Sequence, residues 1–79
     1  MLSETVGGFI PESEVAILLR DTEKAFENCQ IGSYPFFREG KVGSNFVVRS
    51  TDEAALKACM AQLCDGLEAA GFAYTQGGI

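Results

Sequence analysis

The chain has no histidine and no tryptophan among its 79 residues. Without histidine there is no imidazole general base, no Ser-His-Asp or Cys-His relay and no imidazole metal ligand. Positive charge is also scarce, since six Lys and Arg residues stand against eleven Asp and Glu residues and the net charge is -5. Nucleic acids and anionic membranes attract clustered cations, so we expect neither as a partner. We also expect the chain not to be an enzyme in its own right.

Long apolar runs and a secretory leader are missing as well. No stretch approaches the roughly 18 apolar residues of a membrane span, and Met1–Ile10 has no basic segment followed by an apolar one. The three cysteines, Cys29, Cys59 and Cys64, are odd in number and do not form a disulfide framework. On a helix Cys59 and Cys64 would point about 140° apart, so they are no metal pair. We therefore expect buried thiols, no metal or cofactor site, and a cytoplasmic location.

The composition that remains, 47% hydrophobic and 22% charged residues, is typical of one small globular domain spanning residues 1–79 with its core at about 5–75. A first strand is expected at Thr5–Ile10, where Gly7-Gly8 marks a bulge or a close backbone approach. A helix follows, opened by Pro11 to Glu14 and stopped near Asn28.

A hairpin is expected next. The strands Cys29–Phe37 and Val42–Arg49 are joined by the tight turn Arg38-Glu39-Gly40-Lys41, where glycine suits a positive φ. Pro35 lacks a backbone donor, which places its strand at a sheet edge or a bulge. Gly40-Lys41-Val42-Gly43 resembles the GXXG loop of KH domains, but it lies in a hairpin and not between two helices, so we interpret it as a turn.

The second helix is expected at about Thr51–Ala70. Ser50 and Glu53 match a capping box at its start, Gly66 offers close contact with the sheet, and Gly71 ends it. A short last strand at Phe72–Thr75 and a frayed tail complete the chain. The order β-α-β-β-α-β predicts an α+β fold of the split βαβ type, ferredoxin-like or KH-like. Both helices cover one face of a mainly antiparallel sheet, with the first and third strands central.

Carboxylate pairs are the first candidates for chemistry. Three pairs lie close in sequence: Glu12/Glu14, Glu23/Glu27 and Asp52/Glu53. All are expected at helix starts or on solvent faces, where the ordinary role of carboxylates is to cap helices and to keep the protein in solution. We therefore assign no catalytic residue.

The segment from Tyr34 to Phe37 is the most unusual part of the chain, because it holds three of the eight aromatic residues and a proline. Both of its faces cannot be buried in one small two-layer domain. We expect an interaction surface made of Tyr34, Pro35, Phe36, Phe37 and Arg38. The alternative is local packing, with Tyr34 and Phe36 at the sheet edge and Phe37 over the turn.

These residues carry a family resemblance. Ile31–Phe37 (IGSYPFF), the turn Arg38–Lys41, the strand Asn45–Arg49 and Thr51–Glu53 before an alanine-rich helix are similar to one known region. It is the small domain after the molybdopterin-binding-like domain of competence/damage-inducible protein A (CinA). The resemblance covers about Glu12–Gly71. The larger architecture also looks like the molybdopterin-binding-type region attached to some eukaryotic FAD synthases.

The resemblance implies that the chain is a piece of a larger protein and a non-catalytic accessory domain. It would pack on its parent molybdopterin-binding-like domain, or form a homodimer, through the edge strand and Tyr34–Phe37. The parent would hold the ligand site and, in some relatives, nucleotide-sugar pyrophosphatase activity, with nicotinamide-nucleotide deamidase activity in a further domain. A regulatory module that binds a small molecule, either a nucleotide or a pterin, is the alternative.

Overall fold

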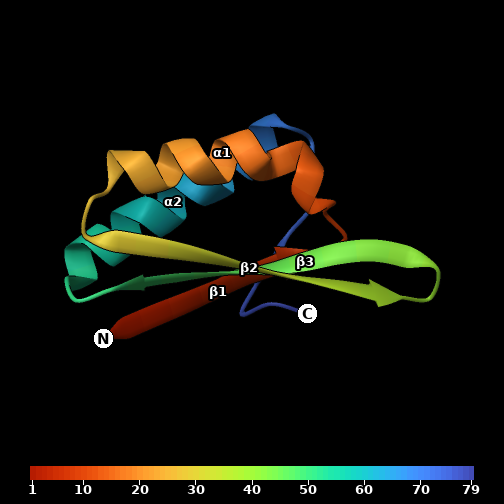
Figure 1. Cartoon of the computed structure of the whole chain (residues 1–79), viewed down its shortest axis with the longest axis horizontal. Helices are drawn as coiled ribbons and strands as arrows, with labels where there is room; N and C mark the ends of the chain where they lie inside the picture. Colours follow the sequence, from red (N-terminus) through yellow and green to blue (C-terminus); the bar gives the residue numbers. More distant parts are fainter.

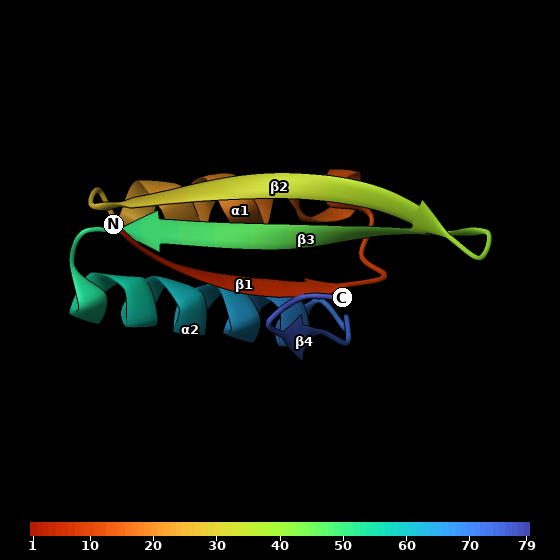
Figure 2. The same cartoon turned by 90° about the horizontal axis from the view of Figure 1, so that it is seen from below.

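The computed structural model describes residues 1–79 as two layers, a four-stranded sheet and two helices (Figure 1). The elements are, in chain order, β1 (Leu2–Gly8), α1 (Glu12–Ala25), β2 (Cys29–Arg38), β3 (Lys41–Ser50), α2 (Glu53–Ala69) and β4 (Thr75–Gln76). Both helices lie against the same face of the sheet, and the other face is open (Figure 2). The predicted α+β split βαβ fold is therefore confirmed.

The sheet has the strand order β2-β3-β1-β4 with antiparallel pairing throughout. β1 and β3 are central, and β2 with Pro35 lies at an edge, as the topology predicted. Val6 lies opposite Phe46, and Ile31 lies opposite Val48. Because side chains alternate along a strand, this register sends Val6, Phe46 and Val48 together toward the helices.

The core lies between the sheet and the helices. Full burial of one such apolar side chain contributes about 1.5–3 kcal/mol. The cluster consists of Val6, Ile10, Val15, Cys29, Phe46, Val48, Leu56, Cys59, Met60, Leu63, Cys64 and Leu67. The three cysteines are buried and free, as expected.

The helices touch at Gly66. A Cβ at Gly66 would meet the side chain of Leu18 on α1. We expected this glycine to allow contact with the sheet, and it instead allows α1 and α2 to approach each other. Close helix–helix packing therefore explains why a residue without a side chain stands at this position.

The predicted bounds of β1 and α1 are wrong. β1 covers Leu2–Gly8 and not Thr5–Ile10, because its residues pair with β3 from Leu2 opposite Ser50 to Gly8 opposite Ser44. Gly7 and Gly8 cause no bulge, and they are the close backbone approach. α1 ends at Ala25, short of Asn28, because the N–H of Phe26 donates to Glu23 O and starts a turn.

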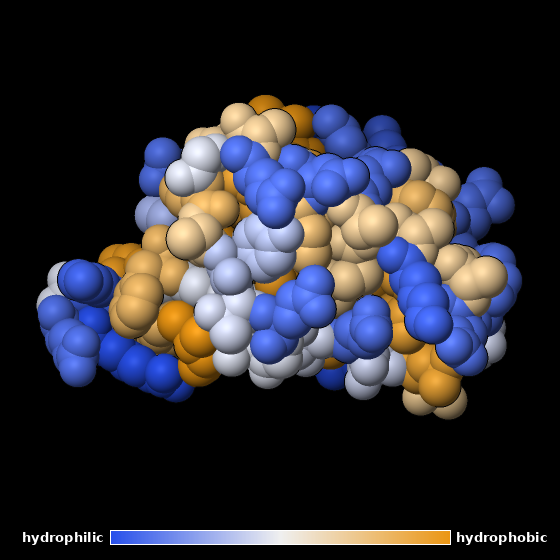
Figure 3. Space-filling view, turned by 180° about the vertical axis from the view of Figure 1, so that it is seen from behind, coloured by the Kyte–Doolittle hydropathy of each residue, from blue (hydrophilic) through white to orange (hydrophobic).

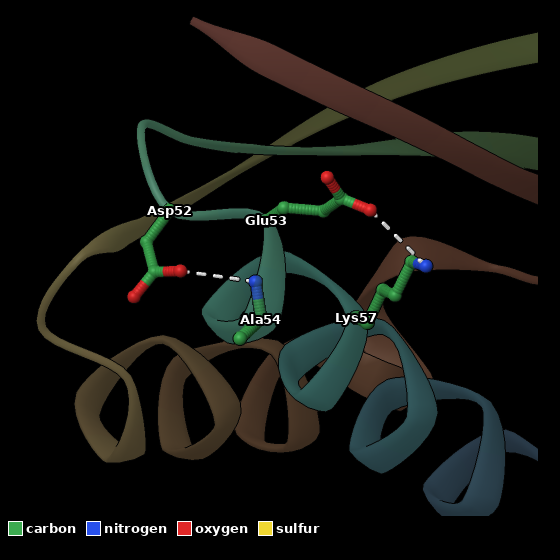
Figure 4. Close-up of polar contacts among 4 residues, drawn as sticks. All are labelled: Asp52, Glu53, Ala54 and Lys57. Atoms are coloured by element: carbon green, nitrogen blue, oxygen red, sulfur yellow. Dashed lines mark hydrogen bonds and ion pairs between the residues drawn. The ribbon is translucent and has the colours of Figure 1, made fainter.

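The start of α2 differs from the predicted capping box (Figure 4). Asp52 is the cap, and its carboxylate accepts a hydrogen bond from Ala54 N at 3.0 Å. Ser50 Oγ instead donates to Asn28 O at 2.8 Å and accepts from Asp52 N at 3.1 Å. Glu53 does not reach back, since its carboxylate pairs with Lys57 at 3.2 Å. Ser50 therefore ties two connections together and caps no helix.

The end of α2 follows the prediction. Gly71 has φ 86°, the Gly71 N–H donates to Glu68 O, and the Phe72 N–H donates to Leu67 O, which is a Schellman motif. No helix of the structure is both long and apolar enough to cross a bilayer.

The predictions for the C-terminal segment are wrong. The last strand is Thr75–Gln76, paired with β1, and not Phe72–Thr75. Phe72 and Tyr74 pack against the core instead. The tail is not frayed, because Gly77 N donates to Thr5 O at 2.7 Å and Ile79 bonds to Asn45.

Candidate functional site

The end of the β2–β3 hairpin projects past both helices (Figure 2). Pairing continues out to Arg38 opposite Lys41, and the two residues between them have positive φ, 52° at Glu39 and 77° at Gly40. Positive φ at both central residues is characteristic of a type I′ turn, whose twist matches that of the strands. The predicted glycine turn is confirmed, and it makes the tip a regular extension of the sheet.

The alternation along β2 separates the five residues expected to form an interaction surface. Pro35 and Phe37 lie on the helix side of the sheet, in register with Ser44 and Val42. Tyr34, Phe36 and Arg38 lie on the open side. The segment thus contributes to two surfaces on opposite sides of one hairpin.

The surface on the helix side is the pair Phe37 and Val42, which we name the tip patch. The side chains lie directly opposite each other and are 71% and 50% exposed. Neither helix reaches this far along the hairpin, so nothing covers the pair. Figure 3 shows apolar surface beside strongly hydrophilic residues at this end of the molecule. The expectation that some rings of the segment are exposed is confirmed.

The open side carries a cation–aromatic cluster of Phe9, Phe36, Arg38 and Lys41. The rings of Phe9 and Phe36 meet edge to face, 5.8 Å apart. The Arg38 guanidinium lies 4.7 Å from the centre of the Phe36 ring, and Lys41 Nζ lies 5.4 Å from that of Phe9. Each cation attracts the negative face of its ring. The sequence did not place Phe9 or Lys41 in this cluster. Phe9 lies beyond the end of β1, and Lys41 was interpreted only as part of the turn.

Asn45 is a further residue that the sequence did not reveal. Its side chain lies across Gly7, where a Cβ would collide with Oδ1. Nδ2 donates to Ile79 O at 2.9 Å, and Oδ1 accepts from Ile79 N at 2.9 Å. Arg38 also donates to Ile79 O, at 3.3 Å. The open face thus holds the main chain of Ile79.

The charges are sorted between the two layers. Arg38, Lys41 and Arg49 lie on the open side of the sheet, and the only carboxylate near them is Glu39 at the turn. The other acids lie on the helices, at their ends or on the helix side of β1: Glu4, Glu12, Glu14, Asp21, Glu23, Glu27, Asp52, Glu53, Asp65 and Glu68. An acidic chain therefore has one basic face.

The cysteine and tyrosine side chains with shifted pKa values, Cys59, Cys64 and Tyr74, are not activated as nucleophiles. Burial, with a smaller contribution from Cys29, raises the pKa of Cys59 to about 12, and burial also raises the pKa of Cys64. A hydrogen bond to Glu68 raises the pKa of the exposed Tyr74 hydroxyl to about 12. Protonated thiols and phenols are poor nucleophiles. No group of three or more His, Cys, Asp or Glu side chains gathers in metal-binding geometry.

The outer edge of β2 offers few donors. Cys29 N donates to Phe26 O at 3.0 Å, and Ile31 N donates to Glu23 Oε2 at 2.8 Å. Pro35, which has the same outward orientation, has no N–H. Of the four outward positions from Cys29 to Pro35, all but Ser33 are therefore closed to another strand, and the edge is not the template for pairing that the sequence suggested.

Comparison with known proteins gives one match. No curated protein and no solved structure matches the chain. A family model, described as the middle domain of FAD synthase, matches residues 1–76.

This match overturns the assignment to the CinA-type molybdopterin-binding-like family. The roles that rested on that assignment fall with it: the accessory domain of such a protein, the parent or homodimer partner, and the nucleotide- or pterin-binding module. The residues behind the resemblance form a hairpin, a type I′ turn and a helix start, which many α+β domains need, so they do not distinguish families. With nearly its whole length matched, the chain belongs to the FAD synthase middle-domain family.

Proposed function

We propose that this chain is a non-catalytic docking domain of an FAD synthase, and that its tip patch binds a neighbouring domain of that enzyme. The observation that supports this most strongly is the projecting hairpin, which presents Phe37 and Val42 beyond the reach of its own helices. A middle domain needs a surface for the parts of the enzyme on either side of it.

The tip patch suits docking energetically. Burial of one large apolar side chain contributes about 1.5–3 kcal/mol, so Phe37 is a sufficient anchor for a small interface. The type I′ turn and the paired strands already hold the backbone of Phe37 in place, which lowers the ordering cost of binding. Pro35 stiffens the same strand further.

The proposal places the chemistry of FAD synthesis outside this domain. The two buried thiols Cys59 and Cys64 have raised pKa values, and the chain has no histidine to act as a base. A catalytic group must be poised near the working pH to exchange protons. This supports a positional role for the domain.

The proposal also places the domain in the cytoplasm. Its three cysteines are buried and free, and a reducing compartment keeps thiols in that state. Fractionation of cells with an antibody against the domain tests this, and recovery from an oxidising compartment would contradict it.

The docking role is tested in the FAD synthase that contains this domain. The double variant Phe37→Ser, Val42→Ser removes the tip patch, and Ile17→Ser on α1, where the native side chain is 67% exposed, is the matched control. We expect the double variant to keep its thermal unfolding midpoint, to be cut faster by protease between domains, and to form FAD more slowly by about tenfold. Equal proteolysis and equal rates in both variants would overturn the proposal.

A further inference from the structure

We propose that the open face of the sheet is a second docking surface, which binds an extended acidic polypeptide segment. The surface is formed by Thr5, Tyr34, Asn45, Val47 and Arg49, and residues 77–79 of the chain's own tail lie on it. It lies on the side of the hairpin opposite to the tip patch, so this inference does not rest on the proposed function.

The Asn45 side chain supplies the contact that favours binding of a polypeptide main chain. Its amide donates to the C=O and accepts from the N–H of a single residue, Ile79, at 2.9 Å each. This paired arrangement satisfies the N–H and the C=O of one residue, which are the two bonds that a residue of an antiparallel neighbouring strand makes. It uses the main-chain atoms of Ile79 and none of its side-chain atoms, so the main chain of another segment meets the same requirement.

Three glycines allow the neighbouring side chains to lie close to the open face of the sheet. A Cβ at Gly7 would collide with Asn45, and one at Gly43 would collide with Phe36. At Gly32 a Cβ would stand 3.2 Å from Cε2 of Tyr34. The three larger side chains therefore lie flat on the sheet, which leaves room above them for another chain.

Charge determines which segment fits. Arg49 lines the surface, Arg38 bonds to Ile79 on it, and Lys41 lies further along the same face, which carries no carboxylate side chain. Arg49 bonds only to the Tyr34 hydroxyl, at 3.2 Å, so it keeps donors free for a partner. Aspartate or glutamate side chains on an extended segment would reach these cations, and lysine or arginine side chains would be repelled.

The aromatic rings favour a peptide over a nucleic acid. Single-stranded nucleic acids bind by stacking bases on free ring faces. Here Arg38 covers Phe36 and Lys41 covers Phe9, and the two rings also contact each other. A net charge of -5 opposes a long polyanion as well.

The segment on this surface lies outside the family match. Thr5, Tyr34, Asn45 and Arg49 fall within the matched residues 1–76, whereas Gly77–Ile79 do not. The surface thus belongs to the family domain, and residues 77–79 are one occupant of it. An acidic segment would displace them.

The test uses the 79-residue chain and a labelled ten-residue peptide that alternates glutamate and threonine. We expect amide shifts at residues 45–49 and 77–79, weakened by added salt. The same peptide with lysine in place of glutamate should not bind. The variant Lys41→Glu, Arg49→Glu should weaken binding about fivefold or more. The matched variant Arg20→Glu, Lys24→Glu on α1 makes the same charge change and should alter binding less than about twofold.

Two further variants separate the causes. Asn45→Asp replaces the donor to the peptide carbonyl with an oxygen and should also weaken binding, with an unchanged thermal midpoint as the folding control. Phe37→Ser should leave peptide binding unchanged, so failure of the tip patch and failure of the open-face surface are distinguishable. Shifts confined to the helices, equal binding of the lysine peptide, or tighter binding of a single-stranded oligonucleotide would each overturn the proposal.

Discussion

The side chain of Leu18 occupies the space beside Gly66 that a Cβ would need. This contact joins α1 to α2. A glycine inside a helix is otherwise unfavourable, because its helix propensity is lower than that of alanine. The contact makes a helix-stabilising substitution harmful, because close packing outweighs helix propensity at this position.

Gly66→Ala is expected to lower the free energy of unfolding by about 1 kcal/mol. Alanine gains about 1 kcal/mol in helix propensity, but overpacking against Leu18 costs about 1–3 kcal/mol. Urea unfolding measures the difference. In a Leu18→Ala background the added methyl group fits, and Gly66→Ala should become stabilising there. A stabilised single variant would show that the helices separate without cost.

Thr22→Val is expected to stabilise the domain by about 1 kcal/mol. The Thr22 hydroxyl is completely buried and has no hydrogen-bond partner, so its loss removes an unsatisfied polar group. Ser50→Ala is the contrasting variant, because Ser50 Oγ bonds to both Asn28 O and Asp52 N. It should cost about 1–3 kcal/mol. Equal losses in both variants, measured by thermal unfolding, would contradict this prediction.

Asp52→Ala is expected to cost about 1 kcal/mol, because the Asp52 carboxylate caps α2 through Ala54 N. Asp52→Asn keeps an acceptor and should cost less. Lys57→Ala tests the adjacent ion pair with Glu53, whose side chains are both 68% exposed, and should change stability by less than about 0.5 kcal/mol. If Lys57→Ala proved as damaging as Asp52→Ala, the cap would not be the main stabiliser of the helix start.

Stability is expected to fall as the pH rises from about 9 to about 12. Burial raises the pKa of Cys59 from 9.0 to about 12, so in this range the unfolded chain releases a proton that the folded domain keeps. Below pH 9 this thiol contributes no pH dependence. Cys64 and Tyr74 also have raised pKa values and act in the same direction. Cys59→Ala should therefore flatten part of the decline in urea midpoint, and an unchanged slope would contradict the assignment.

The fold could be predicted because local signals agreed with topology. Pro35 marked an edge strand, Gly40 a tight turn and Gly71 a helix end, and each is a backbone requirement that one residue reveals. Ser50 misled because a serine before a helix has the same sequence signature whether it caps the helix or bonds elsewhere. Its contact with Asn28 is a tertiary fact.

The candidate site was less accessible from the sequence. The segment Tyr34–Arg38 was correctly singled out for exposed rings, but its division between two faces followed from the register with β3. Asn45 and Ile79 are 34 residues apart, and no sequence pattern around either residue predicts their contact. The family resemblance failed for a related reason, since hairpin residues report on strand geometry more than on ancestry.

The closed edge of β2 has a consequence for behaviour at high concentration. A cross-β ribbon grows only if each added strand finds a donor at every second residue. Here the N–H groups of Cys29 and Ile31 are already used, and Pro35 has none. A second molecule therefore meets an interrupted ladder beside the exposed rings of Tyr34 and Phe37. The β2 edge can thus display apolar side chains for a partner without offering an uninterrupted ladder on which a fibril could grow.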